Sequence, residues 1–490
     1  MSDFLSGAGL LIAAACAAGS VLLPPGRGRS GAMLIALVLF PVLILGDQWH
    51  SAPIVELRHH EVKAAAAVIL GAILVVALAW LFRVRPLLLP LAIIGLLPFR
   101  IPLESGGETA NLLVPLYVVI AAGVLATVFS PPRWERRKPR RQAKILAAFV
   151  LLYALQSLYS VDLSKGLQEA CFFLIPFTLA YTLLREVVWD RRQLVLVLAT
   201  VTVEAVVFML IGSVEFAGRS LFWNEAVIRS NEFHTYFRVN SIFWDPNIYG
   251  RYLALVLVVV TTAVLWIKER RVFWLLCGAI LLLWLGLAQT FSQSSFIALL
   301  AGLAVLAALR WSWRWTLAVV VVGAVGAAFV VILVGGKGFN FNRLNVDTSG
   351  RSNLVSGGAE LFAERPLWGY GSGSFQHAYG DHHEGKAPVT ISHTEPVTVA
   401  AEQGLIGLVA YVALIVIALW TMAAGLWVHG SDRAPPHVFI ARAAVLAAFV
   451  ALLVHTMAYA GFFQDPITWV LMALGASLAA ASDAPVPGRA

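Results

Sequence analysis

Charged residues are scarce in this sequence. Asp, Glu, Lys and Arg make up 13% of its 490 residues, which is about half of the roughly 25% found in soluble domains. Such a small charged fraction excludes an ordinary soluble globular protein. Apolar residues make up 60% of the chain and its mean hydropathy is +0.82, so most of the chain is expected to lie in a membrane.

Cysteine is also scarce. The three cysteines, Cys16, Cys171 and Cys277, all lie inside apolar runs. This pattern excludes a disulfide framework, a CxxC redox site and a zinc site built from thiolates. The three side chains are therefore expected to serve packing.

The apolar runs predict an all-α, polytopic membrane protein. A helix that crosses a bilayer needs about 20 mostly apolar residues. Candidate runs lie at residues 5–24, 31–46, 64–82, 86–103, 111–130, 145–160, 170–184, 194–215, 248–266, 272–290, 291–309, 316–334, 404–428, 437–461 and 466–482. Because several are short, the prediction is about 12 to 15 transmembrane helices in a single membrane domain, residues 1–490. No Lys or Arg precedes the first run, which is interpreted as a retained helix rather than a signal peptide.

Lys and Arg residues indicate the orientation of the chain. Most lie in connections between alternate runs, above all in the basic segment 131–144, and the positive-inside rule places these connections on the cytoplasmic side. The net charge of +8 could also suggest nucleic-acid binding, but that function needs a soluble basic fold with interleaved aromatic residues. No nucleic-acid partner is expected.

Two long polar segments, residues 216–247 and 335–403, then fall on the external side. Long connections without strong structure of their own are usually functional, and the second is expected to be a catalytic loop. The two segments contain eight cations that the positive-inside rule does not require: Arg219, Arg229, Arg238, Lys337, Arg343, Arg351, Arg365 and Lys386. An external cationic site implies an anionic ligand that arrives with a lipid.

Arg351 and Arg238 are the candidate anion-binding residues. Residues 353–364 are predicted to form an amphipathic helix, which places Arg351 near a helix N-terminus, where anions are favoured. The alternative is an arginine that is solvated at a loop end. Asp245 and Pro246 are typical of a helix start, so Asp245 is interpreted as structural, whereas Arg238 has no comparable local explanation.

His393 is the candidate general base. An imidazole with an ordinary pKa of about 6.5 can accept a proton from a sugar hydroxyl, although a lone histidine is more often merely hydrogen-bonded. Glu395 or Glu402 could orient the ring, and Arg365 is a further external cation that could support the site.

Two other patterns in the second segment are interpreted as structural. His382 and His383 with Glu384 could suggest a metal, but adjacent residues seldom converge on one ion and no third spaced ligand is evident. The glycines of GYGSGS, residues 369–374, lack the preceding strand that a dinucleotide fingerprint needs, so they predict a tight turn. No metal and no cofactor is expected.

Taken in order, these segments resemble the O-antigen ligase and O-antigen polymerase superfamily of bacterial membrane glycosyltransferases. The similarity covers roughly residues 86–480. It is most specific in FRVNSIFWDPNIYGRYLAL, residues 237–255, and in the loop bounded by GRSN and SHTEPVTVAAEQGLIGL. Looser similarity lies at residues 96–125, 155–183 and 290–303.

The resemblance implies a metal-independent inverting glycosyltransferase in the bacterial cytoplasmic (inner) membrane, with its active site on the external, periplasmic side. Such an enzyme moves a glycan from a polyprenyl diphosphate-linked donor to a hydroxyl of a glycan or glycolipid acceptor. The family's two external arginines correspond to Arg238 and Arg351, which would bind the diphosphate, and its loop histidine corresponds to His393. Whether the chain is a polymerase or a ligase stays open.

The alternative function is a flippase or transporter of a lipid-linked oligosaccharide. A transporter would predict charged residues in the middle of its spans and similarity between two halves of the chain. We interpret the predicted helices as apolar through their middles, and no half resembles the other. The sequence therefore favours the transferase.

Overall fold

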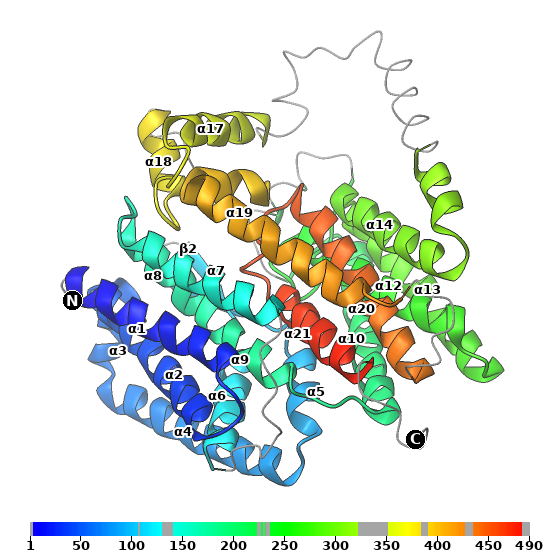
Figure 1. Ribbon diagram of the computed structural model, residues 1–490, viewed down its shortest axis with the longest axis horizontal. Helices are drawn as coiled ribbons and strands as arrows, with labels where there is room; N and C mark the ends of the chain where they lie inside the picture. Colours follow the sequence, from blue (N-terminus) through cyan, green and yellow to red (C-terminus); the bar gives the residue numbers. More distant parts are fainter. Residues whose placement is uncertain are drawn as a thin grey trace.

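The computed structural model describes residues 3–105, 108–129, 141–222, 227–228, 231, 236–321, 351–383, 391–426 and 435–482. Within these ranges nearly all of the chain is helical, and the helices pack side by side (Figure 1). The predicted all-α membrane architecture is confirmed.

The elements follow the predicted runs closely. The first half of the chain contains α1 (Asp3–Leu22), α2 (Arg27–Asp47), α3 (Ala52–His59), α4 (Glu61–Val84), α5 (Leu88–Gly95), β1 (Ile101–Ser105), β2 (Glu108–Leu112), α6 (Val114–Phe129), α7 (Arg141–Ser157), α8 (Leu163–Glu169), a π-helical turn (Ala170–Leu174), α9 (Ile175–Leu184) and α10 (Arg191–Gly218). The second half contains α12 (Pro246–Trp266), α13 (Arg270–Thr290), α14 (Gln293–Arg310), α17 (Arg351–Glu364), α18 (Phe375–His382), α19 (Glu395–Ala423), α20 (Pro436–Thr456) and α21 (Pro466–Ser482).

Ten helices of the described chain are long and apolar enough to cross a membrane. They are α1, α2, α4, the continuous stretch Leu163–Leu184, α10, α12, α13, α14, α19 and α20. Two shorter apolar helices, α6 and most of α21, bring the number to the lower end of the predicted range. The predicted run 316–334 lies largely outside the described residues.

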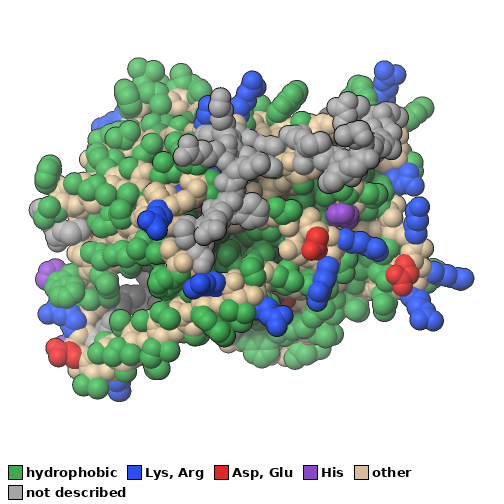
Figure 2. Space-filling model, turned by 60° about the horizontal axis from the view of Figure 1, so that its bottom comes forward, with side chains coloured by type: hydrophobic (Ala, Val, Ile, Leu, Met, Phe, Trp, Pro, Cys, Tyr) green, Lys and Arg blue, Asp and Glu red, His purple; other side chains and the backbone are tan. Residues whose placement is uncertain are grey.

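Hydrophobic side chains cover much of the molecular surface, as the face in Figure 2 shows. Large apolar residues are exposed along α4, α10 and α13, among them Ile69, Val203 and Leu275. Helices that expose such residues need a lipid surface rather than water around them.

The run 86–103 differs from the prediction, because it is not one helix. α5 ends at Gly95, and the chain then enters a hairpin in which β1 pairs antiparallel with β2. Pro98 and Pro102 explain the break, since proline removes a helical hydrogen bond and clashes with the preceding turn. Arg100 is thereby placed in an irregular connection instead of inside a span.

The expectation that all spans are apolar through their middles is wrong for α10. Glu204 lies near the middle of this 28-residue helix and accepts a hydrogen bond from the Tyr252 hydroxyl at 3.1 Å. A carboxyl group at such a depth must be satisfied by a neighbouring helix, and Tyr252 of α12 does this.

The functional residues gather where several helices begin or end. α13 ends beside the beginnings of α12 and α14, and α20 ends beside the beginnings of α19 and α21. We call this region the polar end. The basic turns at residues 185–192 and 267–271 lie at the opposite ends of α10, α12 and α13.

Candidate functional site

Arg238 is held at the polar end by hydrogen bonds from two sides. Its Nε donates to the Thr290 carbonyl oxygen at 3.0 Å, and its Nη2 donates to Asn247 Oδ1 at 3.0 Å. Asn247 is well placed because Asp245 caps α12, accepting from the Asn247 backbone N–H at 2.6 Å. The structural role predicted for Asp245 is therefore confirmed.

A chain of hydroxyl and imidazole groups continues from Asn247 toward His393. The Ser292 hydroxyl donates to Asn247 Oδ1 at 2.9 Å and lies 3.3 Å from the Ser294 hydroxyl. Ser294 shares a hydrogen bond of 3.2 Å with His455 Nε2. The Tyr459 ring then lies between two imidazoles, at 5.9 Å from His455 and 6.2 Å from His393.

His393 itself lies in a constrained backbone position. Its φ is +63°, a left-handed conformation that non-glycine residues seldom adopt, and its carbonyl oxygen accepts from the Ala460 N–H at 3.2 Å. Residues held in such conformations cluster at functional sites, where the surrounding structure fixes them. The side chain is partly buried.

The carboxylates of Glu395 and Glu402 accept hydrogen bonds from backbone N–H groups. Glu395 Oε2 accepts from the N–H groups of Gly461 and Phe462 at 2.7 and 3.1 Å, so it holds the turn that carries Tyr459. Glu402 accepts from the N–H groups of Gly373 and Phe375 at 2.9 and 3.0 Å. These contacts position loops around the site.

The glycines of residues 369–374 form the predicted tight turn. Gly369, Gly371 and Gly373 all have positive φ, and a Cβ at Gly371 would come within 2.2 Å of Ser160. Only glycine permits both this conformation and this close approach. The turn thereby packs against the loop after α7.

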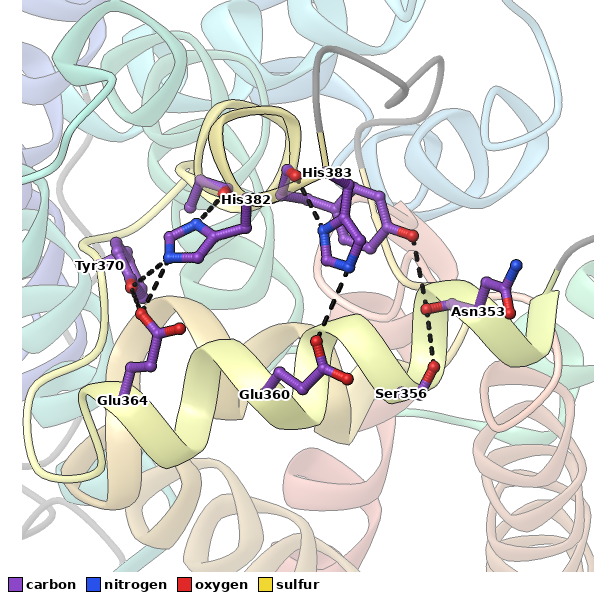
Figure 3. Close-up of polar contacts among 9 residues, drawn as sticks. Asn353, Ser356, Glu360, Glu364, Tyr370, His382 and His383 are labelled. Carbon is purple, nitrogen blue, oxygen red and sulfur yellow. Dashed lines mark hydrogen bonds and ion pairs between the residues drawn. The ribbon is translucent and has the colours of Figure 1, made fainter.

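Arg351 is the first residue of α17, which extends the helix predicted at 353–364 by two residues; its side chain lies outside the described part of the chain. Figure 3 shows how α17 is fastened to α18. His382 Nε2 lies 2.9 Å from Glu364 Oε2, and His383 Nε2 lies 3.7 Å from Glu360 Oε2. These two contacts fix the helix that begins with Arg351.

The His382 contact also shifts two pKa values. The hydrogen bond to the Ala378 carbonyl oxygen, reinforced by Glu364, raises the pKa of His382. Hydrogen bonds from Tyr370 and His382 lower the pKa of Glu364. The pair is therefore charged over a wider pH range than either group alone would allow.

Arg365 points into a separate polar cavity of about 370 Å³. Its guanidinium carbon lies 4.2 Å from the centre of the Tyr370 ring, and Asp381 and His382 line the same cavity. Tyr370 is bonded through its backbone N–H to Ala401, about two turns along α19 from His393. Among the predicted site residues, the structure thus links Arg238 to the neighbourhood of His393 and places Arg365 apart.

Sequence reasoning missed an ion pair at the polar end. Arg251 Nη2 lies 2.7 Å from Asp465 Oδ2, and both side chains are only 4% exposed. Burial lowers the pKa of Arg100, while the Asp465 carboxylate raises it and the charge of Arg251 lowers it. The available signal was Arg251 itself, because an ionisable residue inside a predicted span is a functional candidate.

An apolar groove of about 740 Å³ runs along α12. It is lined from Tyr252 to Ile267 on α12, and by α10, α20 and α21. Fifteen residues of helix correspond to about 22 Å, which is most of the hydrocarbon thickness of a bilayer. Arg191 and Lys268 of the basic turns also line the groove, so it extends from Tyr252 to the basic end.

No group of three or more His, Cys, Asp or Glu residues that could hold a metal ion occurs within the described ranges. The His382 ring contacts Glu364, and the His383 ring contacts Glu360. Glu384 lies outside the described ranges.

Comparison with known proteins gives one family. Residues 278–412 match a family described as O-antigen ligase; a search of curated proteins found no match. The matched segment begins in α13 and runs through α14, α17 and α18 into α19, so it contains Ser292, Arg351 and His393. This family indicates a ligase-type, glycan-transferring role in polysaccharide assembly, in a multi-pass membrane protein. The match over these residues confirms the resemblance to an O-antigen ligase/polymerase-type family that was found in the sequence.

Proposed function

We propose that the protein is a membrane glycosyltransferase that moves a glycan from a polyprenyl diphosphate-linked donor to a hydroxyl of a glycan or glycolipid acceptor. The observation that carries this proposal is the polar network from Arg238 through Asn247 and Ser292 to the rings beside His393. It joins an anion-binding group to a candidate base at one end of a membrane bundle. The family match favours the ligase over the polymerase.

In this reaction the diphosphate leaves without protonation by a general acid. The acceptor hydroxyl has to be activated by a base. The acceptor oxygen forms a bond to the anomeric carbon on the face opposite the diphosphate, and the carbon–oxygen bond to the diphosphate breaks. The electron pair leaves with polyprenyl diphosphate, and His393 accepts the proton of the acceptor hydroxyl. Arg238 and Arg351 stabilise the charge that develops on the diphosphate, so no metal is required in this scheme.

Glu395 and Glu402 support the reaction through the backbone. Glu395 holds the turn of Tyr459 beside His393, and Glu402 holds the glycine turn that leads into α18. Arg365 lines a separate cavity, so it has no direct role in this scheme. This assigns a positioning role to both carboxylates.

The polar end is proposed to face outside the cytoplasmic membrane, which is the periplasm in a bacterium with an outer membrane. Segments 216–247 and 335–403 would then be external loops of a single membrane domain, and the second would be catalytic. The basic turns at residues 185–192 and 267–271 support this orientation, since they lie at the other end of the bundle.

Purified protein reconstituted with a lipid-linked oligosaccharide and a glycolipid acceptor tests the function. The parent should glycosylate the acceptor, and His393→Gln should reduce the rate by about 10²–10⁴ with donor binding retained. His50→Gln, an exposed histidine that follows α2, is the control. Equal rates for parent and His393→Gln would exclude His393 as the base.

The products of the same assay separate the alternative functions. Transfer of an intact glycan to a different acceptor identifies a ligase, and growth of the lipid-linked chain identifies a polymerase. Movement of the donor across the membrane without transfer identifies a transporter and contradicts the proposal.

A further inference from the structure

The cavity of about 370 Å³ where the end of α17 meets α18 lies outside the network of Arg238 and His393. Two acidic side chains, Glu364 and Asp381, and two basic ones, Arg365 and His382, line it together with Tyr370. Its volume falls within the roughly 300–1,000 Å³ that is usual for small-molecule sites. Because acidic and basic groups are equal in number, the cavity does not select a strongly charged ligand.

Contacts inside the protein fix one wall of this cavity. His382 Nδ1 lies 2.7 Å from the Ala378 carbonyl oxygen, and its Nε2 lies 2.9 Å from Glu364 Oε2. The Tyr370 hydroxyl donates to the same oxygen of Glu364. Figure 3 shows that these contacts converge on one carboxylate oxygen and leave the other without one. The wall is therefore held in place without using every polar group on it.

The remaining polar groups are available to a ligand. The Arg365 guanidinium carbon lies 4.2 Å from the centre of the Tyr370 ring, and an arginine that stacks on a ring in this way keeps N–H donors at its edge. Glu364 Oε1 and Asp381 Oδ1 accept no hydrogen bond from any residue that the structure describes. The two carboxyl side chains are 49% and 69% exposed, so solutes can reach them.

Donors and acceptors that lie side by side match the hydroxyl groups of a sugar. Each hydroxyl donates one hydrogen bond and can accept others, so neighbouring sugar hydroxyls are satisfied by an arginine next to a carboxylate. A phosphate or carboxylate ligand would instead be repelled by Glu364 and Asp381, and a metal ion would be repelled by Arg365. The ligand class that fits the cavity is therefore a hydroxyl-rich sugar unit.

Backbone hydrogen bonds join this cavity to the neighbourhood of His393. The Tyr370 N–H donates to the Ala401 carbonyl oxygen at 3.1 Å, and the Gly371 N–H donates to that of Glu402 at 2.7 Å. Ala401 lies about two helical turns, or ~11 Å, along α19 from His393. We propose that Glu364, Arg365 and Asp381 bind one sugar unit of a glycan substrate, away from the bond that reacts. This inference rests on the proposed function and extends it, because a glycan of several units reaches both places.

Steady-state kinetics of Asp381→Asn and Arg365→Gln test this sugar site. Both side chains are exposed, so the variants should fold. Each should raise KM for one glycan substrate by about tenfold to a hundredfold, because a charge-assisted hydrogen bond is lost. Each should leave kcat within about threefold, since the lost contact is equal in the ground state and the transition state. The substrate whose KM rises, the lipid-linked oligosaccharide or the glycolipid acceptor, is the one that occupies the cavity.

Each variant has a matched control. His377→Gln removes the 3.6 Å contact of Asp381 from an exposed residue that does not line the cavity. Arg58→Gln makes the same change at another exposed arginine over an aromatic ring, 4.6 Å from the centre of Trp49. Both should leave each KM within about threefold. If His377→Gln raises KM as much as Asp381→Asn does, Asp381 acts through α18 and not on the sugar.

Equilibrium binding of the two glycans, each released from its lipid and measured alone, separates sugar recognition from transfer. The parent should bind one of them, and Asp381→Asn and Arg365→Gln should weaken that binding by the same factor as they raise KM. The sugar site is overturned if the parent binds neither released glycan, or if both variants bind as tightly as the parent. A protein that binds as expected but transfers no glycan would refute the proposed function and leave this inference standing.

Discussion

Replacing Asp465 by Asn is expected to destabilise the protein strongly, although the two side chains have the same shape. The amide oxygen can still accept the Ile467 N–H, so the start of α21 is kept. The negative charge is lost, and Arg251 keeps a buried guanidinium whose partner at 2.7 Å is no longer charged. The variant therefore leaves one unpaired positive charge in a buried position.

The magnitude follows from the burial of the pair. Breaking a buried ion pair by removing one partner typically costs about 3–5 kcal/mol, and both side chains here are only 4% exposed. Adding Arg251→Met to Asp465→Asn removes the unpaired positive charge. The double variant should therefore recover most of the lost stability, because removing both partners of a buried pair is often nearly neutral.

Denaturant titration followed by tryptophan fluorescence, in one detergent, measures these differences. The control is Asp245→Asn, because Asp245 also precedes a proline and caps α12 in the same way. Asn is as good an N-cap as Asp, so this variant should lose less than about 1 kcal/mol. If Asp465→Asn is as stable as the parent, or if the double variant is no more stable than Asp465→Asn, the reasoning about the unpaired arginine is wrong.

Three further predictions concern single side chains. Glu402→Ala should lower the free energy of unfolding by about 2–4 kcal/mol, because two buried N–H groups lose their acceptor; a parent-like denaturation midpoint would contradict this. The contact between His382 and Glu364 should weaken as pH rises through the raised pKa of His382, and also as pH falls through the lowered pKa of Glu364; hydrogen exchange of α18 that is independent of pH would argue against it. Glu204→Gln should keep the transfer rate within about threefold, since an amide oxygen can still accept from Tyr252, whereas complete loss of function would favour proton-coupled transport.

Local patterns predicted much of the fold. The helix start at Asp245, the helix at 353–364 and the tight turn at 369–374 each depend on neighbouring residues in the sequence, and each is found. Most spans were also predictable, because about 20 apolar residues in a row leave few alternatives to a membrane helix. The run 86–103 is the exception, and Pro98 and Pro102 were the sequence signal that the helix would end there.

Long-range pairing could not be predicted in the same way. Arg251 and Asp465 lie far apart in the sequence, and only the packing of α12 against the start of α21 brings them together. Glu395 and Glu402 were expected near the His393 ring because they are close in sequence, yet their carboxylates accept backbone N–H groups from two other segments. The two residues are seven positions apart and lie on the same face of α19, but they are about two turns apart along it, so each carboxylate meets a different segment.

The buried carboxylates at the polar end all accept hydrogen bonds from backbone N–H groups. Glu215 accepts the Ser241 N–H at 2.8 Å in the segment of Arg238, just as Glu395, Glu402 and Asp465 accept N–H groups in theirs. Irregular backbone near a membrane is tolerated only where its polar groups are satisfied inside the protein. A carboxylate can do this for two amides at once and also offsets nearby arginine charge. The candidate site can therefore combine irregular loops with a buried arginine, because its acidic residues hold the loops.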